Sequence, residues 1–281
     1  GPTKKVSLLL YTRGGNTLTA WSLANLLRQF CDELEIIVPM KCHSAGTLLC
    51  LSADRIVMTK QATLGPIDPS VNGPLNPQIA GANPNTRVPV SVEAINGYIE
   101  FAKGVLGEAG SAALGPALSQ LATQIHPLVL GNAFRARTQI RMLAKRLVTR
   151  QLTDEAKVEK VLNFLCSDSG SHDYTIYRRE AKNEIGLNIE KPSPDGYRLI
   201  KSIYDSIAHE MELSKPFDPM VHLSGSSSAE YEFRRSLVES VGGGCHAFVS
   251  KGRLTKVSLP TGQEVLQDVR SSEGWVHEPT H

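Results

Sequence analysis

Residues 35–69 read EIIVPMKCHSAGTLLCLSADRIVMTKQATLGPIDP, and this stretch decides the fold. The β-branched run at 36–38 predicts a strand, and the apolar spacing of residues 48–53 predicts a helix that leaves a tight turn at 43–46. Ser44 is therefore expected where a strand bends into a helix. The first turn of a helix has unpaired amides and a partial positive charge, which would stabilise an alkoxide or an oxyanion. The alternative is that Ser44 only caps the helix, the usual role of serine at this position.

The sequence on both sides of this turn alternates between strands and helices. We expect strands at 5–12, 35–40 and 55–59, and helices at 17–30 and 44–53. This order predicts an α/β fold with a parallel sheet and right-handed crossovers. Functional groups of such sheets gather at the carboxyl ends of the strands. Gly14-Gly15 and Ser44 each follow a strand, so both are expected at that edge.

The rest of the chain is mainly helical up to residue 214. Residues 66–90 are rich in proline, glycine and asparagine, which predicts a long irregular loop at the rim of the site. Helices are expected at 91–109, 112–124, 132–149, 154–166, 177–184 and 195–213. The tail has one expected helix at 229–240 and strands at 245–250, 254–259 and 264–269. We therefore divide the chain into a core domain of residues 1–214 and a small α+β C-terminal appendage of residues 215–281.

Composition narrows the possible partners and locations. The chain is 41% hydrophobic and 21% charged, as in soluble globular proteins, and its net charge of +2 gives no reason to expect nucleic acid. We interpret the basic run at 135–150 as a solvated face. Five scattered cysteines predict neither a disulfide framework nor a zinc site, and they favour a reducing, cytoplasmic location. No metal or cofactor is expected. No apolar run is long enough to span a bilayer and no signal peptide is recognised, although a membrane anchor upstream of residue 1 is left open.

Four motifs, taken in order, resemble the serine dehydrogenase proteinase family. They are Gly14-Gly15 after the first strand, the turn at 44–47, the segment at 53–58, and Leu64-Gly-Pro-Ile-Asp-Pro69. That family is related to signal peptide peptidase A and, more distantly, to the Clp protease and crotonase fold. The resemblance covers residues 5–190 and implies a Clp/crotonase-like core with added helices. It also implies a homo-oligomer, because homologous folds assemble into dimers or rings.

The resemblance implies specific roles around the turn. Ser44 matches the nucleophile, and the amides of Gly14, Gly15 and Ala45 match the oxyanion hole. Glycine suits this role because it has no Cβ to separate its backbone from a substrate carbonyl. Arg13 stands where relatives usually have proline before the two glycines, so the turn is expected to be looser.

The resemblance also suggests a general base. A lysine on a later helix serves in the signal peptide peptidase branch, and Lys103 resembles it. Its pKa would have to fall from about 10.4 toward 7 or 8, which requires burial. Asp68 stands where a Clp-type triad would have its histidine, so that triad is not carried over. His172 and His126 remain alternative bases, and Asp68 remains a possible lining residue.

The sequence thus predicts an ATP-independent serine endopeptidase with a Ser44–Lys103 dyad that hydrolyses a protein or peptide substrate. It contains no phosphate-binding P-loop, so any dependence on ATP would have to come from a partner. One alternative is an inactive crotonase-like scaffold that binds a protein or peptide and uses Ser44 only as a cap. Another is an acyl-CoA enzyme, which would use the same pair of amides without a nucleophile.

Overall fold

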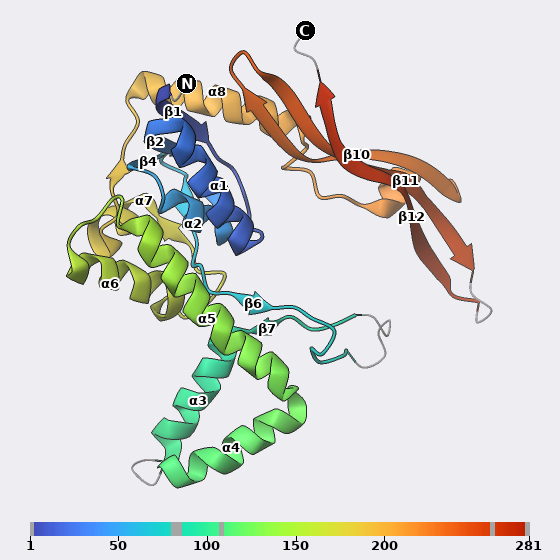
Figure 1. The fold of residues 1–281 in the computed structure, drawn as a ribbon. Helices are drawn as coiled ribbons and strands as arrows, with labels where there is room; N and C mark the ends of the chain where they lie inside the picture. The colour runs from blue at the N-terminus through green and yellow to red at the C-terminus, as the bar shows by residue number, and fades with distance from the viewer. Residues whose placement is uncertain (1–2, 80–85, 107–109, 259–261, 279–281) are drawn as a thin grey trace. The chain divides into compact units, whose positions relative to one another are not determined.

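The computed structural model describes residues 3–79, 86–106, 110–258 and 262–278. The chain, drawn as a ribbon in Figure 1, forms two compact units, Gly1–Arg198 and Leu199–His281. Each unit has its own cluster of buried hydrophobic side chains. The boundary falls within helix α8 (Pro194–Glu210), whereas the sequence analysis placed it after residue 214.

The first unit is built on a parallel sheet of four strands in the order β1-β2-β4-β9. These are β1 (Thr3–Leu9), β2 (Cys31–Val38), β4 (Arg55–Met58) and β9 (Ile189–Glu190). Ile36 of β2 is aligned with Leu8 on one side and Ile56 on the other. The β-branched run of β2 suits a central strand that is covered on both faces. The predicted α/β class and parallel sheet are confirmed.

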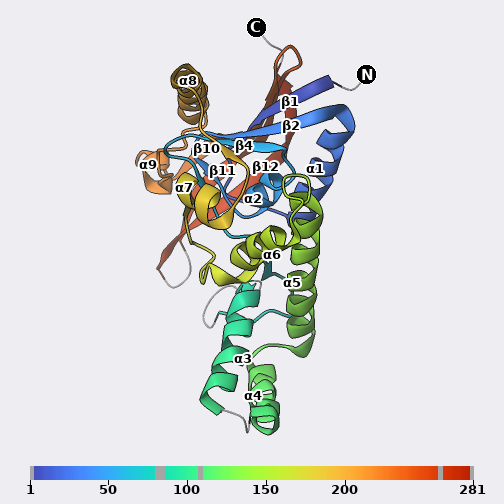
Figure 2. The same cartoon turned by 90° about the vertical axis from the view of Figure 1, so that its left-hand side faces the viewer.

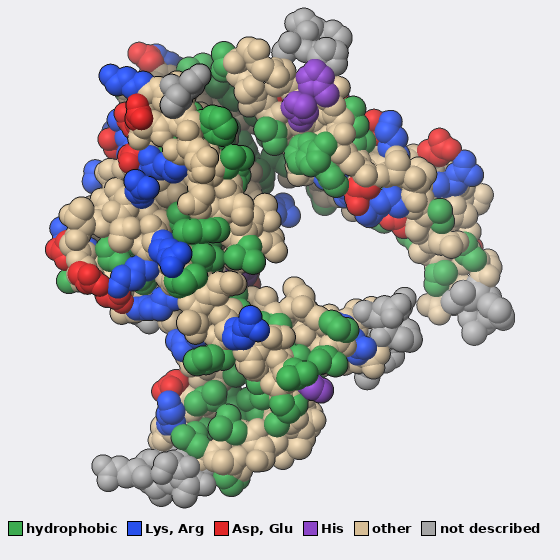
Figure 3. Space-filling model, viewed as in Figure 1, with side chains coloured by type: hydrophobic (Ala, Val, Ile, Leu, Met, Phe, Trp, Pro, Cys, Tyr) green, Lys and Arg blue, Asp and Glu red, His purple; other side chains and the backbone are tan. Residues whose placement is uncertain are grey.

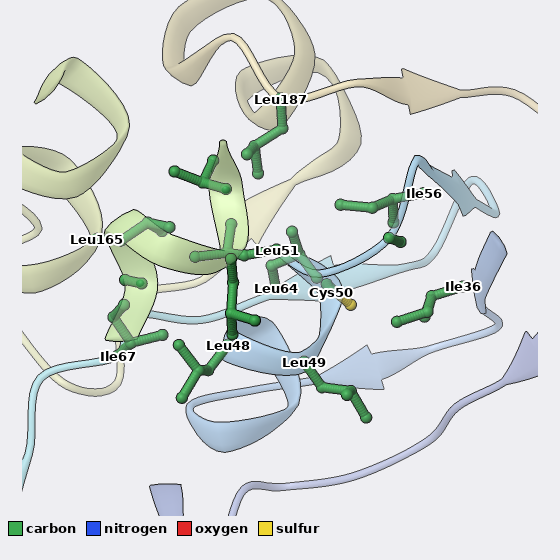
Figure 4. Close-up of a cluster of buried hydrophobic side chains, with 14 of the residues drawn as sticks. Ile36, Leu48, Leu49, Cys50, Leu51, Ile56, Leu64, Ile67, Leu165 and Leu187 are labelled. Carbon is green, nitrogen blue, oxygen red and sulfur yellow. The ribbon is translucent and has the colours of Figure 1, made fainter. Parts of the chain in front are cut away.

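Two helices pack around the bend that carries Ser44. Helix α1 (Thr17–Phe30) begins where the Asn16 side chain accepts a hydrogen bond of 2.9 Å from the Thr19 amide. Helix α2 (Ala45–Cys50) is short and entirely buried. Figure 4 shows Leu48 of α2, and Leu51 directly after the helix, among the side chains of Leu64, Ile67 and Leu165. Each fully buried side chain of this size contributes about 1.5–3 kcal/mol, so this packing fixes the position of the bend.

The described residues between 92 and 168 are mainly helical. They form α3 (Val92–Leu106), α4 (Gly110–Gln124), α5 (Pro127–Val148), α6 (Glu155–Asn163) and a π-helix (Phe164–Asp168). Helix α3 packs against α4 and α5, and α5 runs from this pair back toward α6 (Figure 2). The buried side chains of Leu143 and Leu147 join α5 to the main core. None of the described helices is both long and apolar enough to span a bilayer.

The proline-rich segment is more regular at its base than expected. Strand β6 (Ser70–Val71) pairs in antiparallel fashion with β7 (Val90–Ser91). The Asn76 side-chain amide donates to the carbonyls of Val71 and Val88, at 2.7 and 2.9 Å, and holds the two sides together. The middle of the predicted loop, residues 80–85, lies outside the described residues.

The second unit contains an antiparallel sheet of β10 (Ser228–Ser240), β11 (Gly244–Ser258) and β12 (Glu264–Glu278), with the short helix α9 (Pro219–Leu223). The prediction of a helix at 229–240 is wrong. Ala229, Tyr231 and Phe233 alternate with charged residues, which is the two-residue period of a strand, and they pack with Leu223 and Leu254. The rings of Tyr231 and Phe233 stack with their centroids 4.6 Å apart.

Candidate active site

Ser44 occupies the bend between the short strand β3 (Lys41–Cys42) and helix α2. Its φ of 52° and ψ of −115° are unusual for a residue with a side chain, and such a backbone costs on the order of 1–3 kcal/mol. Its carbonyl accepts the first helical hydrogen bond, from Leu48, at 3.0 Å. Its hydroxyl makes no capping hydrogen bond within the described part of the chain. The side chain is half-buried, so the hydroxyl is not committed to holding the helix.

Gly14 lies directly beside this serine. A β-carbon built on Gly14 would stand 2.9 Å from Ser44 Cβ and 3.5 Å from its Oγ, and Gly14 has a φ of 120°. Only glycine is compatible with both the conformation and the close approach. The Gly14 amide donates to Thr12 Oγ1 at 3.1 Å, so this amide already has an acceptor. A β-carbon on Gly15 would meet no atom within 4 Å, so that side of the turn is open.

His43 is held by contacts with Thr63 and Gly65. Its Nε2 lies 2.9 Å from Thr63 Oγ1 in β5 (Thr63–Leu64), and its ring packs where a β-carbon on Gly65 would be 3.2 Å away. Burial lowers the pKa of His43, and the charges of Lys41 and His172 lower it further. The surroundings of the ring therefore favour its neutral form. The interaction with His172 also places that second imidazole near the bend.

His172 and Asp68 form a carboxylate–histidine pair. The His172 Nδ1 lies 3.0 Å from Asp68 Oδ1, the Asp68 side chain is only 6% exposed, and the imidazole is 50% exposed. The amide of the preceding Ile67 donates to the Leu165 carbonyl at 2.9 Å, which anchors the acid. An ionised carboxylate accepts from Nδ1–H and leaves Nε2 as the proton acceptor. The structure therefore brings together two residues that the sequence analysis kept only as alternatives.

A second acid lies next to this pair, in the first turn of α3. The Glu93 Oε1 is 3.2 Å from Arg137 Nε, and the Glu93 side chain is 20% exposed. Arg137 also donates to Asn96 Oδ1 and Ser167 Oγ, both at 3.3 Å. Burial raises the pKa of Glu93, Arg137 opposes this effect, and the nearby Asp68 carboxylate adds to it. The sequence analysis missed Glu93 and Arg137, because 44 positions separate them and no local pattern connects them.

Lys103 and His126 are placed elsewhere. The Lys103 Nζ pairs with Glu100 Oε1 at 2.8 Å, and its side chain is 50% exposed. It lies about 15 Å along α3 from Glu93, because each helical residue rises about 1.5 Å. His126 caps α5, since its Nδ1 accepts from the Leu128 amide at 3.2 Å. Within the described residues, His, Cys, Asp and Glu form no group of three or more that could hold a metal ion.

A strained serine at a strand–helix bend and a carboxylate–histidine pair are both features that serine hydrolases use. Residues 2–84 match the model of the ClpP-like SDH-type serine proteinase family. The resemblance to the serine dehydrogenase proteinase family is thus confirmed over this segment, which contains Ser44 and Asp68.

Two uncharacterised proteins of Methanocaldococcus jannaschii are similar in sequence. The first is 27% identical over 72% of this chain and 59% of its own length, and the second is 35% identical over 24% of this chain and 23% of its own length. The chain therefore spans less than two thirds of the length of each relative. A mutant of the 1510-N membrane-bound stomatin-specific protease, solved with a substrate peptide, is 18% identical and covers 72% of this chain and 84% of that one. Its TM-score is 0.25.

Proposed function

We propose that this protein is a serine peptidase that hydrolyses peptide bonds without ATP, through an acyl-enzyme formed on Ser44. The observation that carries this proposal is the geometry of Ser44, whose strained backbone and uncapped hydroxyl lie beside Gly14. A serine that only capped α2 would use its side-chain oxygen to accept an amide of the first turn. Strain of this kind persists where surrounding packing enforces it, and it is often found at reacting groups.

We propose His172 as the base, because its imidazole is paired with the buried Asp68 carboxylate. Asp68 would hold the imidazole through Nδ1, and Nε2 would take the proton of Ser44 as the hydroxyl attacks the scissile carbonyl. The same imidazolium would then protonate the leaving amine, and a water molecule would release the acyl group. Lys103 is the second candidate base, but its exposure and its pairing with Glu100 are unlike the desolvated setting that a neutral amine needs.

The proposed oxyanion hole consists of two amides. Ala45 is the first residue of α2, where backbone N–H groups have no partner inside the helix. Gly15 supplies the second amide from the open side of the turn. The Gly14 amide is left out of the hole, because it already donates to Thr12. Gly14 contributes instead by having no side chain beside Ser44. Losing one donor of such a hole typically costs about 10²–10³ in kcat.

A fluorophosphonate probe tests the proposal, because it modifies only an activated serine. We expect covalent labelling at Ser44, loss of labelling in Ser44→Ala, and full labelling in Ser70→Ala, which removes an exposed serine of β6. A protein substrate such as casein should be cleaved by the wild type and not by Ser44→Ala. Absence of labelling at every protein concentration tested would favour the scaffold alternative. Labelling without peptide hydrolysis would indicate another acyl-transfer reaction.

A further inference from the structure

Charged side chains do not single out a binding surface on the described helices α5 and α6. Arg141 of α5 pairs with Glu159 of α6. Lys145 of α5 pairs with Glu155 of α6 at 2.6 Å. Figure 3 shows positively and negatively charged side chains side by side over α6, so a charged ligand would have to displace such pairs. The polar contacts at the candidate active site point instead to one residue, Thr12.

The backbone of Thr12 joins the segment after β1 to the segment that leads into Ser44. An isolated parallel bridge pairs Thr12 with Cys42. The Thr12 amide donates to the Lys41 carbonyl at 2.9 Å, and the Thr12 carbonyl accepts from the His43 amide at 3.1 Å. The place of Thr12 is therefore fixed relative to the bend.

The hydroxyl of Thr12 contacts the turn formed by the two glycines. Thr12 Oγ1 accepts from the Gly14 amide at 3.1 Å and lies 3.3 Å from the Gly14 carbonyl oxygen, to which it donates. Gly14 and Gly15 have φ values of 120° and 156°, and glycine has more backbone freedom than any other residue. The Thr12 hydroxyl thus restrains a turn that its own sequence would leave loose.

The contact with the Gly14 carbonyl also orients the Gly15 amide. These two groups belong to one planar peptide unit, and in a trans peptide the N–H points opposite to the C=O. Because Thr12 Oγ1 lies at the carbonyl oxygen, the Gly15 N–H is directed away from Thr12. Rotation of this peptide unit, which a glycine on each side permits, would aim the N–H in another direction.

The methyl group of Thr12 faces the first turn of α2. A β-carbon built on Gly46 would overlap Thr12 Cγ2, so the methyl group occupies the space that a side chain at position 46 would need. Gly46 is buried and directly follows Ala45, the other proposed amide donor. One half-buried side chain therefore touches the glycine turn with its oxygen and the helix with its methyl group.

We propose that Thr12 is a positioning residue for the oxyanion hole. Its hydroxyl holds the peptide unit that carries the Gly15 amide, and its backbone and methyl group hold that unit in place relative to Ser44 and Ala45. Amides fixed in this way before substrate binds need no rearrangement during the reaction. The inference rests on the proposed function, because the two amide donors are assigned there.

The test separates the hydroxyl from the methyl group. Thr12→Val keeps the shape of the side chain and removes its oxygen. We expect kcat for hydrolysis of labelled casein to fall by about 10²-fold, which is the cost of displacing a catalytic group by about 1 Å. KM should change little, because the oxyanion is absent from the bound substrate. Thr12→Ser keeps the oxygen and should restore most of kcat.

Thr59→Val is the matched control, because Thr59 makes the same kind of contact at the end of β4. Thr59 Oγ1 accepts from the amide two residues later, that of Gln61, at 3.3 Å, and donates to the Pro39 carbonyl at 2.7 Å. Thr59 is only 2% exposed, so Thr59→Val should lower Tm at least as much as Thr12→Val. Its kcat, measured where both variants are folded, should stay near that of the wild type.

Hydrogen exchange of the Gly14 amide, followed by NMR, gives a readout that does not depend on turnover. Exchange should be faster in Thr12→Val than in the wild type and unchanged in Thr12→Ser. Unchanged exchange in Thr12→Val, an equal loss of kcat in Thr12→Ser, or a loss of kcat that follows Tm in Thr59→Val as well would overturn the inference.

Failure of the proposed function would look different. A wild-type protein that neither cleaves casein nor labels at Ser44 would reject the peptidase, and with it a catalytic purpose for Thr12. An active wild type whose kcat is indifferent to Thr12→Val would reject the role of Thr12 alone.

Discussion

A β-carbon on Gly14 would lie 2.9 Å from the β-carbon of Ser44, closer than such atoms approach in folded proteins. Gly14→Ala should therefore displace the serine and destabilise the fold by about 1–3 kcal/mol through strain and overpacking. Peptide hydrolysis should also fall, because the serine is displaced. Gly15→Ala introduces strain at a φ of 156° but meets no atom within 4 Å, so its effect on thermal unfolding should be smaller. Equal destabilisation by both variants would contradict this relationship.

The identity of the base can be decided by a pair of substitutions. His172→Gln should lower kcat/KM by roughly 10²–10⁴, the usual contribution of general acid–base catalysis. Lys103→Met should leave turnover within about twofold, because its amine is half-exposed and paired with Glu100. Peptide hydrolysis by both purified variants, with thermal unfolding as a check on folding, measures this difference. The reverse pattern would assign the reaction to the Ser44–Lys103 dyad predicted from the sequence.

Glu93 should make stability depend on pH in an unusual direction. The pKa of Glu93 is raised in the folded chain by burial, so the folded state binds more protons than the unfolded state between the two pKa values. The free energy of unfolding therefore falls as pH rises through this window, which begins near the unfolded value of about 4.3. Glu93→Gln should raise Tm relative to the wild type at pH 7.5 and give a smaller gain at pH 4. Calorimetry at both pH values measures the effect.

Glu100→Gln is the control for this experiment, since it removes an exposed carboxylate of the same helix. The quantity to compare is the difference in Tm between Glu93→Gln and wild type. If this difference is more negative at pH 7.5 than at pH 4, the ion pair with Arg137 outweighs burial.

Asp54 should make stability depend on pH in the direction opposite to that of Glu93. Arg28 Nη1 lies 2.6 Å from Asp54 Oδ2, and the Leu34 amide donates to the same oxygen at 2.7 Å. Burial raises the pKa of Asp54, but these hydrogen bonds outweigh it and hold the pKa below its usual range. The resulting stability is present above the unfolded pKa of about 3.9 and is lost as pH falls through the lowered folded value.

Asp54→Asn should therefore lower Tm at neutral pH, and its difference from the wild type should shrink in acid. Asp195→Asn, which removes an exposed carboxylate, should change Tm little at any pH. A constant difference between Asp54→Asn and wild type from pH 7 to pH 2 would show that the ionisation of Asp54 is not responsible.

Local sequence patterns were sufficient to predict much of the secondary structure of the core. Helix α1 spans residues 17–30 as its apolar spacing predicted, and β2 and β4 form the expected neighbouring parallel strands. These elements carry their periodicity within a few consecutive residues, so nearest-neighbour chemistry determines them. Segment 229–240 was misjudged because its long charged side chains favour a helix, whereas the alternation of Tyr231 and Phe233 determines its packing in the sheet.

The candidate site was less accessible to such reasoning. Ser44 and its glycines could be located, because the strand, turn and helix are contiguous in the sequence. The choice of Lys103 depended on the family resemblance and required this lysine to be buried, but the described structure leaves it half-exposed. The pairing of Asp68 with His172 and that of Glu93 with Arg137 depend on how distant segments are brought together. No pattern within either partner's own segment specifies these contacts.

The hydrogen bond between Asp68 and His172 closes a separation of 104 residues. A chain emerging from the ribosome exposes its N-terminal residues first, so Ser44 and Asp68 are made well before His172. Closing so long an interval carries an entropic cost that only the assembled core can offset. A nascent chain, or a fragment truncated before residue 172, would therefore contain Ser44 without the proposed proton acceptor. On the proposed mechanism, hydrolytic power arises only once synthesis has passed that point, which protects the unfinished molecule from its own chemistry.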